Sequence, residues 1–184
     1  MNELKKNPLA KLIGTWKGNT GIDLAPKPEE DENNPYYEIL TITPVDINIE
    51  NAEEQELKAV EYHQIVREKS NDKVSHSETG HWIWDKENNR VMNGFSIPRG
   101  VCVLASGEVE ETEDQLTLTV FTDNNDTNGG IVQSAFMQQK ANTKSFKRTF
   151  KVTGNTLSYT QETVLDIYGK VFSHIDENVL TKEE

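Results

Sequence analysis

One histidine near the C-terminus is the residue whose type and setting could most readily do chemistry. His174 lies in the middle of the segment 171–180, which follows a turn at residues 168–170. Side chains at alternate positions of a strand point to the same face, and we call each such set of positions a parity. Apolar residues fall on both parities of this segment, a pattern that predicts a strand covered on both sides. A neutral imidazole there could ligate a metal or a haem iron, titrate near neutral pH, or simply make buried hydrogen bonds. The residue alone favours the last role and leaves the others open.

Other pairs of residues have types that could do chemistry, but their spacing in the sequence is wrong for it. His76 and His81 are five residues apart, so on a strand they point to opposite faces and cannot share a zinc ion. Asp176 and Glu177 are adjacent and diverge in the same way, which argues against a glycosidase carboxylate pair. The loop 123–130 lacks the glycine and the glutamate that an EF-hand requires, and we interpret it as a polar loop. No phosphate-binding loop, nucleophile elbow or zinc signature occurs.

Length and composition restrict the classes of protein to consider. A chain of 184 residues is expected to form one domain, over 1–184, that buries roughly 70% of its unfolded surface. The net charge of -12 repels nucleic acid and anionic membrane surfaces, so neither is an expected partner. The sequence has no apolar run approaching a membrane span and no signal peptide in residues 1–8, which predicts a cytoplasmic location. A single cysteine, Cys102, excludes an internal disulfide.

The elements that must position His174 are mostly strands. A short helix over 4–12 precedes a strand over 13–21, whose Trp16, bracketed by glycines, is predicted to plug one end of a barrel. Segment 23–35 is predicted to be a solvated acidic loop, and 131–142 a short helix or an irregular segment against a barrel mouth. Further strands are expected over 36–44, 57–68, 74–85, 90–97, 101–107, 115–122, 144–153, 156–167 and 171–180.

This series of strands predicts an all-β fold. About ten short, evenly spaced antiparallel strands favour a single closed up-and-down β-barrel of the lipocalin type over a sandwich, because closure removes the edge strands. Several strands carry polar and apolar residues on both parities. A packed sandwich core would alternate more cleanly, so this mixture favours a barrel with a partly polar ligand cavity.

Three segments, in this order, resemble the nitrobindin family of ferric-haem-binding β-barrels, which are related to fatty-acid-binding proteins. They are Gly14-Thr15-Trp16-Lys17-Gly18, Glu78-Thr79-Gly80-His81-Trp82 and the last strand with His174. The resemblance implies a ten-stranded barrel that holds haem b in its mouth, with a histidine of the last strand as the only protein ligand of the iron. His174 falls at that position. The family also implies reaction with nitric oxide and isomerisation of peroxynitrite to nitrate at a ferric iron with one open face.

The resemblance also suggests which residues line the pocket. The apolar candidates around the haem are Met92, Phe95, Val101, Val103 and Phe172, and Arg99 could meet a propionate.

The sequence departs from the family pattern in two places. The family motif is Gly-x-Trp-x-Gly-x-Gly, and here the third glycine, Gly21, comes one residue late. Segment 23–35 resembles an insertion that could cover or narrow the opening of the barrel. Asp176 and Asn178 share the parity of His174. They could orient its imidazole, or they could indicate a ligand more polar than haem.

Two classes of function remain open at this stage. The first is a haem-binding barrel with peroxynitrite isomerase activity. The second is a non-enzymatic carrier of a fatty acid or another small amphipathic ligand, with Arg99, Arg67 or a tyrosine meeting its polar head. A protein that binds partners through its outer surface has no specific support. Both main hypotheses predict a small-molecule ligand and a monomer or homodimer.

Overall fold

The computed structural model describes residues 7–26, 29, 32–45 and 56–184. Nearly all of this part of the chain forms β-strands, joined by a 3₁₀ helix (Pro8–Leu12) and one short helix, α1 (Ala135–Lys140). The strands are β1 (Gly14–Ala25), β2 (Glu32–Val45), β3 (Leu57–Glu68), β4 (Val74–Asp85), β5 (Arg90–Ile97), β6 (Val101–Glu111), β7 (Gln115–Asp123), β8 (Gly130–Gln133), β9 (Ala141–Thr153), β10 (Thr156–Ile167) and β11 (Lys170–Lys182). No helix in the described residues has the length and apolar character needed to cross a bilayer.

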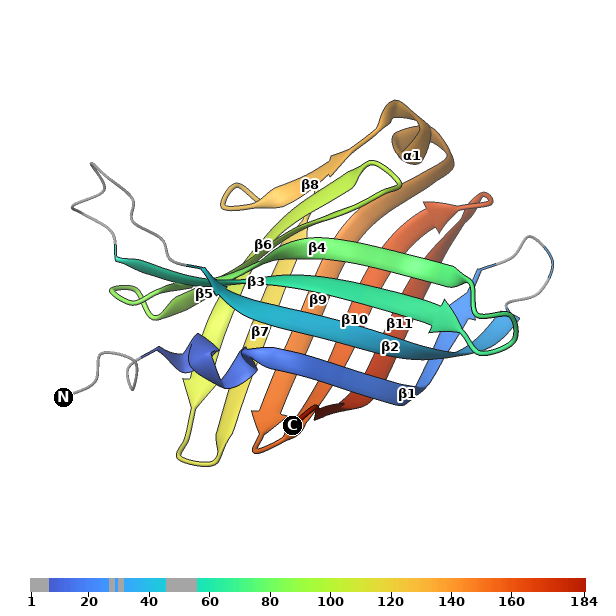
Figure 1. The fold of residues 1–184 in the computed structure, drawn as a ribbon. Coiled ribbons are helices and arrows are strands. Elements are labelled where there is room, and N and C mark those ends of the chain that lie inside the picture. Colours follow the sequence, from blue (N-terminus) through green and yellow to red (C-terminus); the bar gives the residue numbers. More distant parts are fainter. Residues whose placement is uncertain (1–6, 27–28, 30–31, 46–55) are drawn as a thin grey trace.

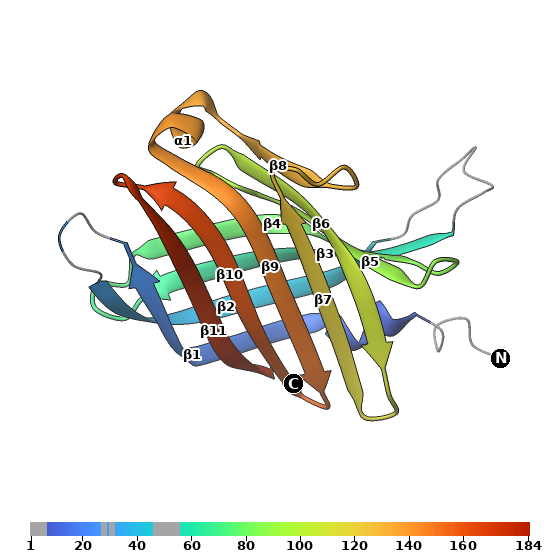
Figure 2. The ribbon, with the colours of Figure 1, turned by 180° about the vertical axis from the view of Figure 1, so that it is seen from behind.

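The strands close into an antiparallel barrel. Hydrogen-bonded neighbours follow the order β5-β4-β3-β2-β1-β11-β10-β9-β7-β6, and β6 pairs back onto β5. Figure 1 shows β1 to β4 along one wall, with β7, β9, β10 and β11 crossing behind them, and Figure 2 shows those strands from the other side. β8 adds to the edge of β6 outside the closed circuit. The predicted closed barrel of ten antiparallel strands is therefore confirmed.

Strand boundaries agree with the sequence pattern over most of the chain. The ranges expected for β3, β4, β5 and β10 match the structure residue for residue. The prediction of a loop over 23–35 is wrong at both ends, because β1 runs to Ala25 and β2 begins at Glu32. Asp23 pairs with Asn34 across these two strands. Part of the supposed rim is therefore barrel wall.

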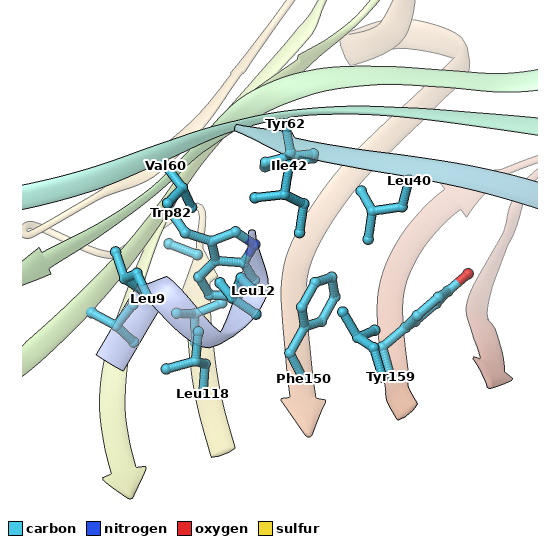
Figure 3. Packing of buried hydrophobic residues seen from close by; sticks show 14 of the residues in the cluster. Leu9, Leu12, Leu40, Ile42, Val60, Tyr62, Trp82, Leu118, Phe150 and Tyr159 are labelled. Carbon is cyan, nitrogen blue, oxygen red and sulfur yellow. The ribbon is translucent and has the colours of Figure 1, made fainter. Parts of the chain in front are cut away.

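One end of the barrel is sealed by the 3₁₀ helix. Leu9, Leu12 and Trp16 are completely buried, and the indole Nε1 of Trp16 donates a hydrogen bond of 2.7 Å to the carbonyl of Leu12. Figure 3 shows Leu9 and Leu12 packed toward Trp82 and Leu118 on the barrel wall. Such apolar burial is the main source of stability in a barrel of this size. We call this the closed end, and it confirms the predicted role of Trp16.

The outer face of β11 differs from the prediction. Val171, Ile175 and Val179 are 72%, 49% and 54% exposed, so no described element covers them. Their parity faces outward, while Phe172 and Leu180 on the other parity are buried. The expectation of a strand covered on both sides is therefore wrong. Apolar residues on both parities arise here from a barrel wall whose outer face is left open to solvent.

Candidate functional site

At the end of the barrel opposite the closed end, which we call the mouth, several interior side chains are partly exposed. Alternation along β4, β5, β10 and β11 directs one set of side chains inward, and several of those near this end are only half-buried. They are His76, Phe95, Ile97, Gln161, Thr163, Leu165, His174 and Asp176. The short helix α1 packs against β9 at this end, with Met137 buried in the core. Interior side chains are thus partly accessible from this side.

His174 lies on the inner wall of the mouth. It faces inward from β11, beside Thr163 of β10, which in turn neighbours Phe146 of β9. The rings of His174 and Phe172 have centroids 6.1 Å apart. The imidazole side chain is 24% exposed, so a ligand entering the mouth could reach it.

Two carboxylates contact the imidazole. Nε2 of His174 lies 2.6 Å from Oδ1 of Asp23 on β1 and 3.4 Å from Oδ1 of Asp176, two residues along β11. Burial would lower the pKa of His174. The hydrogen bonds and negative charges of Asp176 and Asp23 outweigh it and raise the pKa from 6.5 to about 10. His174 is therefore an imidazolium at neutral pH while both contacts persist.

A local irregularity in β1 brings Asp23 to this position. The pairing of β1 with β2 shifts register between Gly18 and Gly21. A Cβ on Gly18 would lie 2.7 Å from the amide nitrogen of Asn178, and one on Gly21 would lie 2.1 Å from the ring of Tyr36. Both glycines are thus required by close approach rather than by backbone angles. The bulge is why simple alternation did not indicate that Asp23 faces His174.

Four of the predicted pocket residues face the interior. Phe172, Val101 and Val103 are buried. Phe95 is half-buried, with its ring centroid 4.9 Å from that of Phe146. These residues lie on the inner face of the barrel, and their contact with a ligand stays a prediction.

The other two predicted residues lie elsewhere. Met92 alternates with the buried Val91 and Asn93 and therefore faces outward, so its assignment to the pocket is wrong. The reason is that Asn93 takes the inward position, where its amide bonds Tyr62. Arg99 is exposed in the turn between β5 and β6, close to the mouth, and its contact with a propionate stays a prediction.

The sequence analysis missed a buried ion pair beneath the mouth. Nη1 and Nη2 of Arg148 donate to the two oxygens of Glu78, at 2.8 and 3.1 Å, and Nη1 also donates to Asn93 at 2.8 Å. Arg148 is 2% exposed, and its guanidinium stacks 4.9 Å from the Phe95 ring centroid. Burial alone would raise the pKa of Glu78, but the Arg148 charge and hydrogen bonds hold it at about 2. The signal was available, since Arg148 shares the parity of the apolar Phe150.

A second buried carboxylate, Glu38, has neutral partners. It accepts hydrogen bonds from Tyr159 at 2.6 Å, from Asn178 at 3.2 Å and from Gln64 at 3.3 Å. Tyr159 also shares a hydrogen bond of 3.0 Å with Tyr36. Burial raises the pKa of Glu38, although these hydrogen bonds oppose the shift. The predicted polar interior is therefore real, but its groups satisfy one another.

A groove on the outer wall is lined mostly by outward-facing residues, and Phe95 lines it as well. It has a volume of about 600 Å³ and crosses β2 to β5, where Thr41, His63, Thr79 and His81 line it. His63 and His81 are exposed, on the outward parity of their strands. The structure thus places His81 away from His76, as their spacing predicts.

Comparison with known proteins identifies relatives of the whole barrel. Residues 5–182 match the family model described as "THAP4-like, heme-binding beta-barrel domain". Among solved structures, the crystal structure of Rv2717c from M. tuberculosis superposes with a TM-score of 0.73 over 96% of this chain and 95% of that chain, at 20% sequence identity. A search of curated proteins finds no match. The resemblance to nitrobindins is confirmed by these findings.

Proposed function

Since this chain belongs to the THAP4-like, heme-binding β-barrel domain family, we propose that its mouth binds ferric haem b through Nε2 of His174. The observation that carries the proposal is the position of this imidazole, which projects from the last strand into the mouth beside Phe172. A haem site needs an imidazole nitrogen for the iron and apolar contacts for the ring. Phe172, Phe95 and Phe146 supply such contacts.

The donor set fits a haem once the hydrogen bond between His174 and Asp23 opens. An iron ligand must be neutral, whereas the two aspartates favour the imidazolium form. Haem uptake is therefore expected to release a proton and to tighten as the pH rises from neutral toward 10. In the bound state Asp23 would be free to turn toward solvent, because it is half-buried at the mouth.

Isomerisation of peroxynitrite to nitrate is the activity we infer for the loaded protein. When bound, ferric haem would supply a Lewis acid toward a peroxynitrite oxygen. His174 would hold the iron, and the rings of Phe172 and Phe95 would supply apolar contacts that limit the access of water. The pair formed by Arg148 and Glu78 closes the interior below, so the substrate would stay at the mouth. Peroxynitrite and nitrate are isomers, so the reaction needs no further oxidant or reductant.

A titration of haem-free protein with haemin tests the ligand assignment. We expect one haem per chain with a Soret band in the wild type, and affinity weaker by more than about 100-fold in His174→Ala. That bound is chosen because loss of a partner that merely orients a ligand already costs 10–100-fold. The matched control is His76→Ala, which removes the half-buried imidazole on the opposite wall and should keep both band and affinity.

The titration can contradict the proposal in two ways. If His174→Ala retains the wild-type spectrum and affinity, His174 is not the ligand. If His76→Ala loses the haem instead, the iron lies on the other wall. For the activity, stopped-flow decay of peroxynitrite with nitrate analysis should show faster isomerisation by haem-loaded protein than by haem-free protein. Equal nitrate yields would remove the isomerase assignment and leave the binding intact.

Carriage of a fatty acid in the same barrel has less support. A buried cation should meet the carboxylate of such a ligand, yet the guanidinium of Arg148 is already paired with Glu78. Arg99 is exposed, and Arg67 donates to a backbone carbonyl. This alternative predicts that fatty acids displace a fluorescent probe from the wild type and from His174→Ala equally well.

A further inference from the structure

Asp23, His174 and Asp176 form a cluster of metal-ligating side chains at the mouth. One donor atom from each lies within 4.8 Å of the other two. Asp176 and His174 project from the same face of β11, and Asp23 meets them from β1. All three are half-buried, with their side chains 24%, 24% and 17% exposed for Asp23, His174 and Asp176. The cluster therefore combines fixed positions with access from the mouth.

The donor types and spacing suit a first-row divalent metal ion. Imidazole favours Zn²⁺ and its neighbours over Mg²⁺ and Ca²⁺, and carboxylates complete many such sites. Bonds of 2.0–2.2 Å in a tetrahedron place neighbouring donor atoms roughly 3.3–3.6 Å apart. The distance of 3.4 Å between His174 and Asp176 already fits, whereas the distance of 2.6 Å to Asp23 would have to widen by rotation of its carboxylate.

The backbone pairing of β1 with β11 is short at the same place. Among the described residues, the backbone register between β1 and β11 covers only Trp16 with Lys182 and Lys17 with Thr181. Beyond this point the strands are joined by side chains, through Thr20 with Asn178 at 3.0 Å and Asp23 with His174. A metal ion with ligands from both strands would join them where the backbone does not. Binding to the folded state alone would also stabilise the barrel.

We propose that Asp23, His174 and Asp176 bind one divalent first-row metal ion, such as Zn²⁺, with a coordination position open to the mouth. The ion would bind haem-free protein, and haem and metal would exclude each other because both require Nε2 of His174. With a neutral imidazole the three ligands carry two negative charges, which the ion balances. This inference goes beyond haem binding and does not depend on it.

Zn²⁺ binding to the haem-free full-length chain tests the proposal by competition with a chromophoric chelator. We expect one ion per chain, a rise in melting temperature with added Zn²⁺, and affinity at least about 10-fold weaker in Asp23→Asn, Asp176→Asn and His174→Ala. Asp166→Asn is the matched control, since this exposed carboxylate lies on the adjacent β10. It should bind Zn²⁺ as the wild type does.

Two results would overturn the site: absence of stoichiometric Zn²⁺ binding to the wild type, or equal Zn²⁺ affinity in the wild type and all three ligand variants. Asp23→Asn separates this failure from a failure of the haem proposal. It should weaken Zn²⁺ binding while leaving haemin uptake unchanged or tighter, because it removes the competitor for Nε2. His174→Ala should weaken the binding of both Zn²⁺ and haemin. If it weakens only one of them, His174 is not a ligand of the other.

Discussion

The two ends of the barrel are built from the same alternating strands but differ in what fills them. At the closed end, Leu9, Leu12 and Trp16 are completely buried, and their packing needs little more than one indole hydrogen bond. At the mouth, His174 and Asp176 are half-buried and depend on charge and hydrogen bonding. Stability can thus be concentrated at one end, while the other end keeps accessible groups whose pairing a ligand can replace.

The buried layer around Arg148 separates these two regions. Its guanidinium bonds Glu78, Asn93 and Gln161 from three other strands, so the layer spans the barrel. A ligand at the mouth therefore meets a floor of paired polar groups before it reaches the apolar core. The site is expected to be shallow, which suits a flat ring better than a long chain.

The largest effect is expected from breaking this layer. Arg148→Met leaves the Glu78 carboxylate buried without its cation and should lower the free energy of unfolding by about 3–5 kcal/mol. Urea unfolding followed by circular dichroism measures the change. The double variant with Glu78→Met should recover part of the loss, because it removes the stranded charge as well. A single variant as stable as the wild type would show that the pair does not hold the barrel together.

The closed end can be weakened without touching the mouth. Leu12→Ala should cost about 2–5 kcal/mol in unfolding free energy, since it leaves a cavity beside Trp16. Haemin stoichiometry should not change. Leu104→Ala is the matched control, because that leucine is 40% exposed and its loss should stay within about 0.5 kcal/mol. Equal costs for the two leucines would contradict the division between the ends.

A smaller effect, confined to the mouth, concerns the proton on His174. Its folded pKa of about 10 exceeds 6.5, so its stabilising contribution is complete below pH 6.5 and is lost as the pH rises toward 10. Histidine NMR titration of haem-free protein should show this raised pKa. Asp23→Asn should lower it, and Asp166→Asn should leave it unchanged. A wild-type value near 6.5 would mean that the two aspartates do not hold the imidazolium.

Alternation and turn residues predicted most of the barrel. Strands β3, β5 and β10 have regular parity and clear ends, and β4 departs from it only in a register shift near its first residues, so a local pattern was sufficient. β1 was cut short because the prolines and the acidic run of segment 23–35 favoured a loop there. The bulge between Gly18 and Gly21, which sets the direction of Asp23, was not predicted. A bulge depends on how two strands pair, which a local pattern does not contain.

The inward-facing residues of the mouth were predictable only where family resemblance or parity marked single residues. His174 and Phe172 were identified in that way. The pairing of Arg148 with Glu78 was not, since the partners are 70 residues apart and meet only once the barrel closes. Met92 was misassigned because both parities of β5 carry apolar residues, and only the bond from Asn93 to Tyr62 shows which parity faces inward.

Both described ends of the chain lie at the closed end. The 3₁₀ helix begins at Pro8, and the amide of Glu183 donates a hydrogen bond of 2.8 Å to Thr15, next to Trp16 (Figure 1). An attachment made at the C-terminal end would therefore lie away from His174. The barrel could be fixed to a sensor surface, or joined to a second protein, by that end with its mouth facing the solution.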